Sequence, residues 1–515
     1  MVDLQLAQWF PNELLLQLWL GFWPAAFVCF LLEVMLLPQG RGLWRRPLSI
    51  WAGHLAVLLF IYVIELLLFQ RPWFAASQLL FWQTLMLVVN RVKLAQLYEP
   101  FVYQDLHYFI DIFRHPRLYL PFFGTFRLVV ALLVPSVLVY VALQLEVPLT
   151  QQWQWAQLVP SMLLLGMVMM GFAFYSYVQV SPLVGVDPTL DQAEMGMLGG
   201  FIAYAKAERH LAELAEPLES IPHGQCQPHL VVVQSESFFD FRRLWPAVQP
   251  ACYQWFDELN SASILHGELT VPAIGANTLR SEFTFLTGLT NSEQGIHRFN
   301  PYRRLARQQL TTLASRLKAQ GYRTVCVHPY PVSFYQRDRV FPHLGFDEFI
   351  DRKAFSQHTE HQYVGDIDVA ECVQRILESA TEPTFVFVIT MENHGPLHLE
   401  KIAINEPAQY LTELPPNSVR EVTAYLRHIA NAGTMAKMLC QTLQHNDRPG
   451  LLCWYGDHLP ILPDLYKAQR FDSHRTDYFI WSTDAAESAQ SQQPMTTRPI
   501  DELANILLTL LARYD

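Results

Sequence analysis

The chain has 515 residues, of which 51% are hydrophobic and only 16% are charged, and its formal net charge at pH 7 is −11. This length exceeds one ordinary domain, and so apolar a composition excludes a typical wholly soluble enzyme. The negative charge argues against a general nucleic-acid binder, which presents a basic surface.

Five long apolar runs precede residue 181. Each approaches or exceeds the roughly 20 residues that cross a bilayer as a helix. Trp and Tyr residues gather at their ends, as in the aromatic belts of membrane proteins. The first run is too long for a cleaved signal peptide and lacks the basic flank of one. The predicted spans are 14–37, 50–69, 73–92, 122–145 and 155–180.

The basic residues of this region lie mainly in the loops 41–46 and 91–117. The positive-inside rule places both loops, and the domain that follows the fifth span, in the cytoplasm. The chemistry that the motifs described below indicate requires this domain outside the cytoplasm. The two expectations therefore conflict. Between the third and fourth spans, residues 98–122 carry aromatic side chains at helical spacing, which predicts an interfacial amphipathic helix.

The chain after the spans has the composition of a globular domain. Residues 181–227 are more polar and are expected to link a membrane domain, 1–180, to an α/β domain, 228–515. Short β-branched runs alternate there with amphipathic stretches, a pattern that predicts a mostly parallel sheet with helices on both faces. The predicted strands are 229–236, 322–328, 384–390, 451–457 and 478–483, and the predicted helices are 305–320, 369–379 and 419–443.

Reactive side chains follow four of the predicted strands. In open parallel sheets, ligands bind beyond the carboxyl ends of the strands, so these side chains are expected to share one crevice. They are Glu236, His328, Glu392 with His394, and Asp457 with His458.

Two carboxylates and an imidazole among these residues form a candidate metal site. Glu236, Asp457 and His458 suit Mn²⁺ or Zn²⁺, and the oxygen of Thr278 would complete a set of four ligands. Each residue has an ordinary alternative, since Asp457-His458 is also a turn dipeptide and Glu236 also a helix-cap partner. Thr278 follows the turn G-A-N, where it either caps a helix or presents its hydroxyl to a phosphate at the helix N-terminus.

Three motifs together resemble a known family. A Glu at the end of the first strand, G-x-N-T-x-R-x-E-F-x-x-L-T-G around Thr278, and the later G-D-H are similar to the lipoteichoic acid synthase and phosphoglycerol transferase branch of the alkaline phosphatase/sulfatase superfamily. The resemblance covers about residues 228–510. It implies a phosphoglycerylated Thr278, and one Mn²⁺-like ion, with Mg²⁺ or Zn²⁺ as alternatives, held by Glu236, Thr278, Asp457 and His458.

The same resemblance assigns four substrate-binding residues, namely His328, Tyr335, Arg337 and His394. An arginine offers a bidentate fork to phosphate oxygens, and a histidine donates to an oxygen or protonates a leaving alkoxide. Two alternatives stay open: Arg337 forms a surface ion pair with Asp338, or His328 is a buried imidazole with satisfied nitrogens.

The sequence also departs from the family pattern. Leu462 and Tyr330 stand where small polar residues are usual, which bears on the acceptor rather than on the metal set. The formylglycine motif C/S-x-P-x-R is absent at the nucleophile position, which counts against a sulfate-ester hydrolase. Farther on, His474 and Arg475 are possible contacts on the acceptor side.

The expected function is a membrane-anchored transferase that moves a phosphoglycerol head group from phosphatidylglycerol to a glycan or lipid acceptor. Its expected place is the bacterial inner membrane, with the catalytic domain facing the periplasm and no nucleic-acid partner. Alternatives are a phosphoethanolamine transferase, a phosphodiesterase or sulfatase-like hydrolase of the same fold, and an inactive lipid-binding scaffold.

Overall fold

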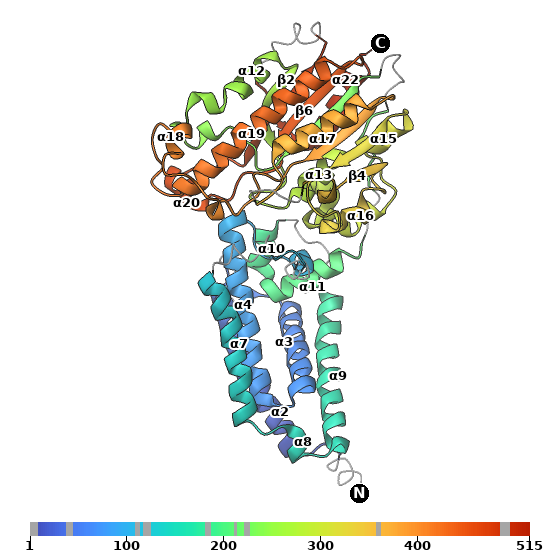
Figure 1. Cartoon of the computed structure of the whole chain (residues 1–515). Helices are drawn as coiled ribbons and strands as arrows, with labels where there is room; N and C mark the ends of the chain where they lie inside the picture. Colours follow the sequence, from blue (N-terminus) through green and yellow to red (C-terminus); the bar gives the residue numbers. More distant parts are fainter. Residues whose placement is uncertain are drawn as a thin grey trace. The chain divides into compact units, whose positions relative to one another are not determined.

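The structure is a computed structural model that divides into two compact units, Met1–Leu211 and Ala212–Asp515, here called the helical unit and the sheet unit (Figure 1). It describes residues 9–37, 45–108, 114–116, 125–180, 187–210, 214–220, 227–356, 362–484 and 495–514.

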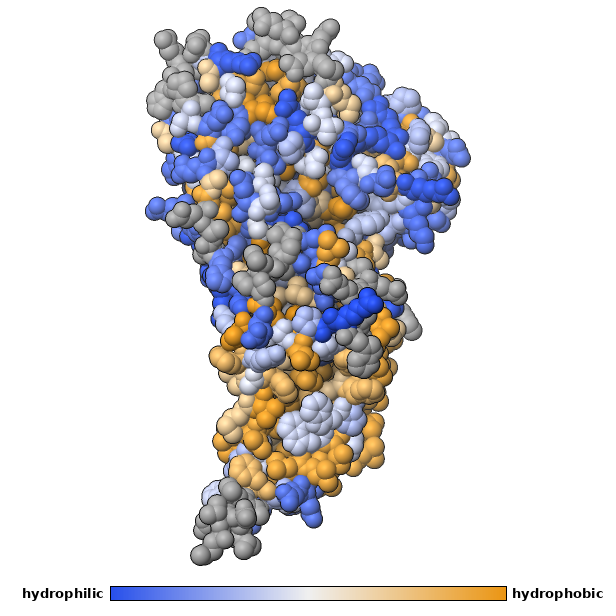
Figure 2. Space-filling model, turned by 180° about the vertical axis from the view of Figure 1, so that it is seen from behind, coloured by the Kyte–Doolittle hydropathy of each residue, from blue (hydrophilic) through white to orange (hydrophobic). Residues whose placement is uncertain are grey.

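Five helices among these residues are long and apolar enough to cross a membrane. Each lies close to a predicted span, so the prediction of five spans is confirmed. The surface over the helical unit is largely apolar, whereas the surface over the sheet unit is largely hydrophilic (Figure 2). The candidate spans contain α2 (Asn12–Leu32), α3 (Leu48–Phe69), α4 (Pro72–Leu97), the part of α7 (Thr125–Leu145) from Leu133 onward, and α9 (Trp155–Gln179).

Shorter elements complete the helical unit. Within residues 98–122, for which an interfacial helix was predicted, the described part contains the 3-10 helix η3 (Tyr103–His107), and residues 109–113 and 117–122 lie outside the described residues. The other short helices are α8 (Leu149–Gln152), α10 (Pro188–Met195) and α11 (Met197–Ala207).

A buried ion pair lies inside the helical unit. Arg46 Nη1 donates to Glu33 Oε2 at 2.8 Å, and Gln83 Nε2 donates to the other oxygen of Glu33 at 3.2 Å. Gly196 passes so close, at φ +71°, that a Cβ there would overlap the Arg46 guanidinium. The carboxylate of Glu33 is therefore satisfied within the fold, since a buried charge needs such partners.

The sheet unit is built on eight strands in the order β4-β3-β5-β1-β6-β7-β2-β8. The five strands from β4 to β6 are parallel, β7 is antiparallel to both of its neighbours, and β8 pairs in parallel with β2. The strands are β1 (His229–Ser235), β2 (Leu265–Thr270), β3 (Arg323–Val327), β4 (Glu348–Ile350), β5 (Thr384–Ile389), β6 (Gly450–Gly456), β7 (Arg475–Ser482) and β8 (Arg498–Pro499).

Helices cover both faces of this sheet. On one face, Val231 and Trp454 belong to a core shared with α12, α17 and α19, which Figure 1 shows alongside the strands. On the other, Phe285 of α13 stacks on Phe387 with ring centroids 5.7 Å apart. The helices are α12 (Gln254–Ala262), α13 (Thr278–Thr287), α14 (Asn291–Gln294), α15 (Leu313–Ala319), α16 (Arg337–Val340), α17 (Asp366–Glu378), α18 (Pro407–Tyr410), α19 (Val419–Gln444), α20 (Pro463–Gln469) and α22 (Leu503–Leu511).

The predicted fold class, a five-helix membrane part followed by an α/β unit with a mostly parallel sheet, is confirmed. All five predicted strands are present, and the sheet also contains the unpredicted β2, β4 and β8. The predicted helix over 305–320 was wrong in its first half, because only Leu313–Ala319 is α-helical. Thr312 caps that helix by accepting a hydrogen bond from the backbone N–H of Ser315, which fixes its start.

Candidate active site

The pairing of β1 with β6 determines where two of the predicted ligands lie. These central strands run parallel, and Ser235 stands opposite Gly456 at their carboxyl ends. The next residues along each strand are Glu236 and Asp457, so the two carboxylates leave the sheet side by side. Parallel strands present their carboxyl ends at one edge, which explains why residues 221 positions apart meet.

The structure brings Glu236, Asp457 and His458 together in a buried cluster. One ligand atom from each residue lies within 4.8 Å of the other two. His458 Nε2 is 3.5 Å from Glu236 Oε1 and 3.3 Å from Asp457 Oδ2. Ligands that share one cation at about 2.0–2.2 Å stand at such separations.

Neighbouring groups orient all three side chains. Ser237 donates its backbone N–H to Asp457 Oδ1 and its hydroxyl to Glu236 Oε1, both at 2.9 Å. His458 Nδ1 lies 3.0 Å from the carbonyl oxygen of Leu459. Because a carbonyl only accepts, Nδ1 carries the proton there and Nε2 keeps the lone pair that a ligand needs.

The electrostatics of the cluster fit a divalent cation. Burial, and then the charge of Asp457, raise the pKa of Glu236 to about 8. Asp457 Oδ2 is buried and makes no hydrogen bond within the described part of the chain. Adjacent buried carboxylates are costly without compensating positive charge, and two carboxylates with one imidazole suit Mn²⁺ or Zn²⁺.

Thr278 is the first residue of α13, and Asn277, in the left-handed region at φ 70°, occupies the cap position. The alternative that Thr278 caps the helix was therefore wrong. One turn along, Ser281 donates its hydroxyl to the backbone oxygen of Asp457 at 2.7 Å. This bond fastens the start of α13 to the segment that carries two of the predicted ligands.

Arg337 and His328 belong to a closed buried network. Arg337 pairs through Nε and Nη2 with both oxygens of Glu282. The ion pair of Arg337 is therefore buried and made with Glu282, in place of the predicted surface pair with Asp338. Its Nη1 lies 3.2 Å from His328 Nε2. Since an arginine only donates, His328 keeps its proton on Nδ1, which lies 3.0 Å from the oxygen of Ile389.

This arrangement fixes the charge of His328. Burial, followed by the Arg337 charge, lowers its pKa well below the usual range, so the imidazole is neutral. The alternative of a buried imidazole with both nitrogens satisfied describes what the structure shows. Whether His328 also contacts a substrate remains a proposal.

Tyr335 lies against the guanidinium of Arg337, whose central carbon is 5.2 Å from the centroid of the tyrosine ring. Both Tyr335 and Gln336 have positive φ, 55° and 57°, a conformation that costs free energy in residues with a side chain. Ser237 and Asn277 share this property. Strain of this kind concentrates at functional sites, and here it affects the predicted site residue Tyr335 and three residues next to predicted site residues.

His394 connects the two groups electrostatically. Its Nδ1 lies 2.7 Å from the carbonyl oxygen of Gly395. Burial lowers the pKa of His394, while that carbonyl and the charge of Asp457 act in the opposite direction. When protonated, His394 also lowers the pKa of His328, so His394 interacts both with the carboxylate cluster and with the Arg337 network.

Glu282 is the main residue that sequence reasoning missed. In the sequence it stands four residues after Thr278, one helical turn on, and that position indicates no partner for its carboxylate. Instead its carboxylate is fully buried, binds Arg337, and accepts a hydrogen bond from Tyr302 at 2.6 Å. The one signal in the sequence for a role of Glu282 was that it is the Glu of the E-F pair in the threonine motif.

A second buried acidic pair lies near Glu236. The backbone N–H of Asp366, the first residue of α17, donates to Glu392 Oε2 at 2.7 Å. Burial, then Glu392 and Glu236, raise the pKa of Asp366 well above its usual range. Glu392 thus anchors the start of a helix, a role its position after a strand did not reveal.

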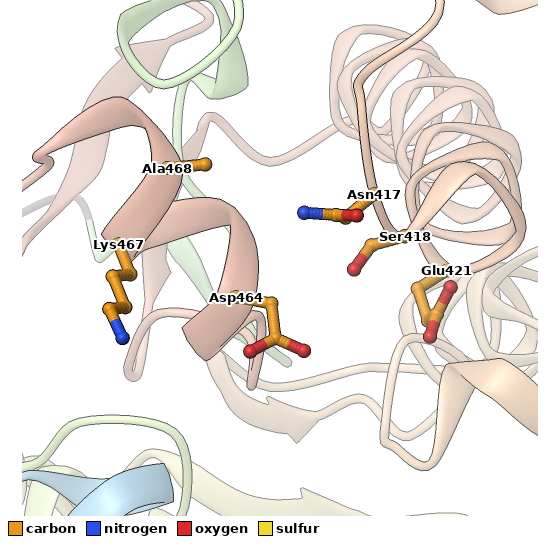
Figure 3. Close-up of a pocket in the computed structure, with 6 residues that line it drawn as sticks. All are labelled: Asn417, Ser418, Glu421, Asp464, Lys467 and Ala468. Atoms are coloured by element: carbon orange, nitrogen blue, oxygen red, sulfur yellow. The ribbon is translucent and has the colours of Figure 1, made fainter.

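An open groove of about 640 Å³ lies between the start of α19 and α20 (Figure 3). None of the predicted site residues lines it. Its lining residues are Asn417, Ser418, Glu421, Asp464, Lys467 and Ala468. The groove is therefore distinct from the cluster at the strand ends, although α20 begins only five residues after His458.

Comparison with known proteins gives a family and several relatives that this chain resembles. The model of the family described as Sulfatase matches residues 228–512. The capsular polysaccharide biosynthesis protein RkpI of Rhizobium meliloti is 28% identical over 435 residues, 80% of this chain and 77% of that protein. Lipoteichoic acid synthase 1 of Bacillus subtilis is 31% identical over 85 residues, 16% of this chain and 13% of that protein.

A solved structure shares the fold along almost the whole chain. The integral membrane protein lipooligosaccharide phosphoethanolamine transferase A of Neisseria meningitidis superposes with a TM-score of 0.57 at 10% identity, covering 96% of this chain and 95% of that one. This likeness concerns the fold, which joins a membrane part and a sheet part in the same order.

We predict that Asp457→Asn weakens binding of a divalent cation by at least about tenfold, since even partners that only orient metal ligands contribute that much. Titration calorimetry of the purified full-length protein with Mn²⁺ measures the change. Asp464→Asn, the same substitution in the open groove, is the control and leaves the affinity unchanged. Equal affinities of the two variants would remove Asp457 from the metal site.

We predict that Glu282→Gln destabilises the sheet unit by about 3–5 kcal/mol, because it leaves Arg337 buried without its partner charge. Glu348→Gln, which breaks the exposed pair with Arg323, costs about 0–1 kcal/mol. Chemical unfolding of both variants, followed by tryptophan fluorescence, gives the comparison. Similar small losses in both would show that the Glu282–Arg337 pair does not hold this region.

Proposed function

This chain belongs to the sulfatase family, and from that premise we propose that it is a membrane-anchored phosphotransferase. It moves a phosphoglycerol head group from phosphatidylglycerol to a glycan or lipid acceptor. The observation that carries the proposal is the buried cluster of Glu236, Asp457 and His458, with the start of α13 fastened beside it.

The identity of the nucleophile separates this reaction from sulfate-ester hydrolysis. A sulfatase of the formylglycine type needs a modified Cys or Ser, whereas this chain has Thr278 followed by Leu279 and Arg280. A threonine hydroxyl cannot supply the hydrated aldehyde that sulfate-ester hydrolysis of this type requires, but it can form a phosphoester. Thr278 is half-buried at the first position of α13, where N–H groups of the helix favour a phosphate.

A divalent cation held by Glu236, Thr278, Asp457 and His458 would neutralise phosphate charge and make the Thr278 hydroxyl more acidic. In the first displacement, Thr278 Oγ bonds to phosphorus, the bond to the diacylglycerol oxygen breaks, and that oxygen takes the proton which Thr278 releases. In the second, an acceptor hydroxyl bonds to phosphorus, the bond to Thr278 breaks, and the acceptor's proton returns to Thr278.

His394 is our choice for the group that carries these protons. Its Nδ1 is engaged by the carbonyl of Gly395, which leaves Nε2 for exchange with a reacting oxygen. Burial keeps its pKa below the usual value, so the neutral form that accepts a proton predominates at pH 7. A positioned general acid or base of this kind contributes typically about 10²–10⁴-fold.

Arg337, His328 and Tyr335 are proposed to position the head group. Glu282 accepts from Nε and from one N–H of Nη2, and His328 Nε2 accepts from one N–H of Nη1, so the second N–H of Nη1 and of Nη2 are those that could meet an oxygen of the substrate. Neutral His328 adds no charge. Glu282 can therefore hold the Arg337 side chain in place while the remaining N–H groups of Arg337 bind the substrate.

The acceptor and the donor rest on different observations. A glycan acceptor is supported by the relative named for capsular polysaccharide biosynthesis. Phosphatidylglycerol is supported by the relative named lipoteichoic acid synthase; phosphatidylethanolamine is the alternative. An inactive scaffold is disfavoured because all four proposed ligand positions hold residues that can bind metal.

We predict that Thr278→Ala loses transfer by several orders of magnitude, because the attacking oxygen is gone, while stability changes by less than about 1 kcal/mol, because Thr278 is not the cap. Thr278→Ser retains part of the activity. Thr290→Ala, which removes the hydroxyl that caps α14, is the control and keeps transfer. Turnover of head-group-labelled phosphatidylglycerol is measured, and a Thr278→Ala protein of near wild-type rate would contradict the proposed nucleophile.

We predict that the sheet unit faces the outside of the cytoplasmic membrane, where glycan acceptors are exposed, although the basic loops favour the opposite orientation. Fusions placed after His210, alkaline phosphatase in one set and green fluorescent protein in the other, distinguish the two. Phosphatase activity is expected. Fluorescence alone would place the unit in the cytoplasm and would also contradict the proposed acceptor.

A further inference from the structure

The side chain of Tyr363, which no motif in the sequence singles out, lies against His394. The two rings meet edge to face, with centroids 5.4 Å apart and an interplanar angle of 63°. The Tyr363 hydroxyl is 3.4 Å from His394 Nδ1 and donates to the carbonyl oxygen of Gly395 at 3.3 Å. Tyr363 is itself buried. Its hydroxyl thus meets the imidazole at the Nδ1 edge, inside the protein.

The groups around Gly395 determine which nitrogen of His394 carries the proton. A carbonyl oxygen only accepts, and that of Gly395 lies 2.7 Å from His394 Nδ1, so Nδ1 carries a proton. The Tyr363 hydroxyl directs its own proton to the same carbonyl, and Gln362 Nε2 donates to the hydroxyl oxygen at 3.1 Å. The oxygen of Tyr363 therefore turns a lone pair toward Nδ1. Both neighbours favour the tautomer whose free lone pair is on Nε2.

The segments that carry the two residues are joined at a second point. Asp366, three residues after Tyr363, donates its backbone N–H to Glu392 Oε2 at 2.7 Å, and Glu392 stands two residues before His394. Asn431 of α19 donates to the other oxygen of Glu392 at 2.5 Å. Because the Glu392 carboxylate fixes the backbone and Tyr363 contacts the ring, together they set the orientation of the imidazole.

This orientation matters for the proton transfers assigned above to His394, a step that rests on the proposed function. The imidazole takes the proton of Thr278 and delivers it to the leaving oxygen, so its Nε2 lone pair must face the reacting atoms. A general acid or base acts only within hydrogen-bond reach of the proton that it transfers. An imidazole that rotates, or that holds its resting proton on Nε2, loses this geometry.

We infer that Tyr363 is a positioning residue for His394. Its hydroxyl, together with the carbonyl of Gly395, holds the imidazole in the tautomer and orientation that present the Nε2 lone pair to the reacting oxygens. Tyr363 acts through His394 and needs no contact with the substrate. Loss of its hydroxyl therefore affects the reaction only while His394 is present.

A double-mutant cycle on the full-length protein tests this role. Tyr363→Phe keeps the ring and removes the hydroxyl, and it is made both in the wild-type chain and in a His394→Ala background. Tyr514→Phe is the matched control, since Tyr514 is buried to the same extent and its hydroxyl bonds to that of Ser482. Ser482 pairs with Leu451 near the amino end of β6, whereas the proposed metal ligands follow carboxyl ends of strands.

The measured quantity is the rate at which head-group-labelled phosphatidylglycerol labels Thr278, followed by rapid quench over a range of lipid concentrations. Tyr363→Phe is expected to lower the maximal rate by about tenfold or more, a part of the roughly 10²–10⁴-fold that a positioned acid or base contributes. The half-saturating lipid concentration stays unchanged. In the His394→Ala background the same substitution has no further effect, because a residue that acts through another is not additive with it. Tyr514→Phe keeps the rate of its parent in both backgrounds.

An equal loss from Tyr363→Phe in both backgrounds would overturn the inference, since it shows a structural role that does not pass through His394. No loss in the wild-type background would overturn it as well. If the wild-type protein itself gives no label on Thr278, the proposed function fails, and the role of Tyr363 in it fails too. The two failures are distinguishable, because the second appears before any variant is made.

Discussion

Glu236 and Asp457 leave adjacent parallel strands and enter the same buried space, where two negative charges would repel each other. This repulsion is the constraint on which the site depends. Burial and the partner carboxylate raise the pKa of Glu236 to about 8, and the second oxygen of Asp457 has no hydrogen-bond donor among the described residues. Ser237, Leu459 and Ser281 hold the cluster in place. A bound cation resolves the repulsion and also serves phosphate chemistry.

Much of the fold could be predicted because its signals are local. Five apolar runs of spanning length gave five helices, and β-branched runs gave the central strands of a sheet buried on both faces. Strand β2 escaped prediction because its sequence, LHGELT, is only partly buried and contains Gly267, whose Cα lies against the backbone of Thr496. Its place in the sheet depends on β7 and β8, which no local pattern reveals.

The positions of site residues that directly follow a strand could be predicted from the sequence. The roles of residues that depend on a partner far away in the sequence could not. Glu236, His328, His394 and Asp457 were found by that rule. The role of Glu282 depends on Arg337, 55 residues away, and no spacing rule links the two. Thr278 is the first residue of α13 and not its cap because Asn277 has a left-handed backbone. The sequence alone is compatible with either position of Thr278.

The proposed function depends on a covalent phosphoester that Thr278 forms with the head group of a lipid donor. Its most direct test is to incubate the purified full-length protein with head-group-labelled phosphatidylglycerol or phosphatidylethanolamine, quench rapidly, and map the label by peptide mass spectrometry. We expect label on the peptide that contains Thr278, with phosphatidylglycerol the better donor. Labelled product formed without any labelled Thr278, or label on another residue, would contradict it.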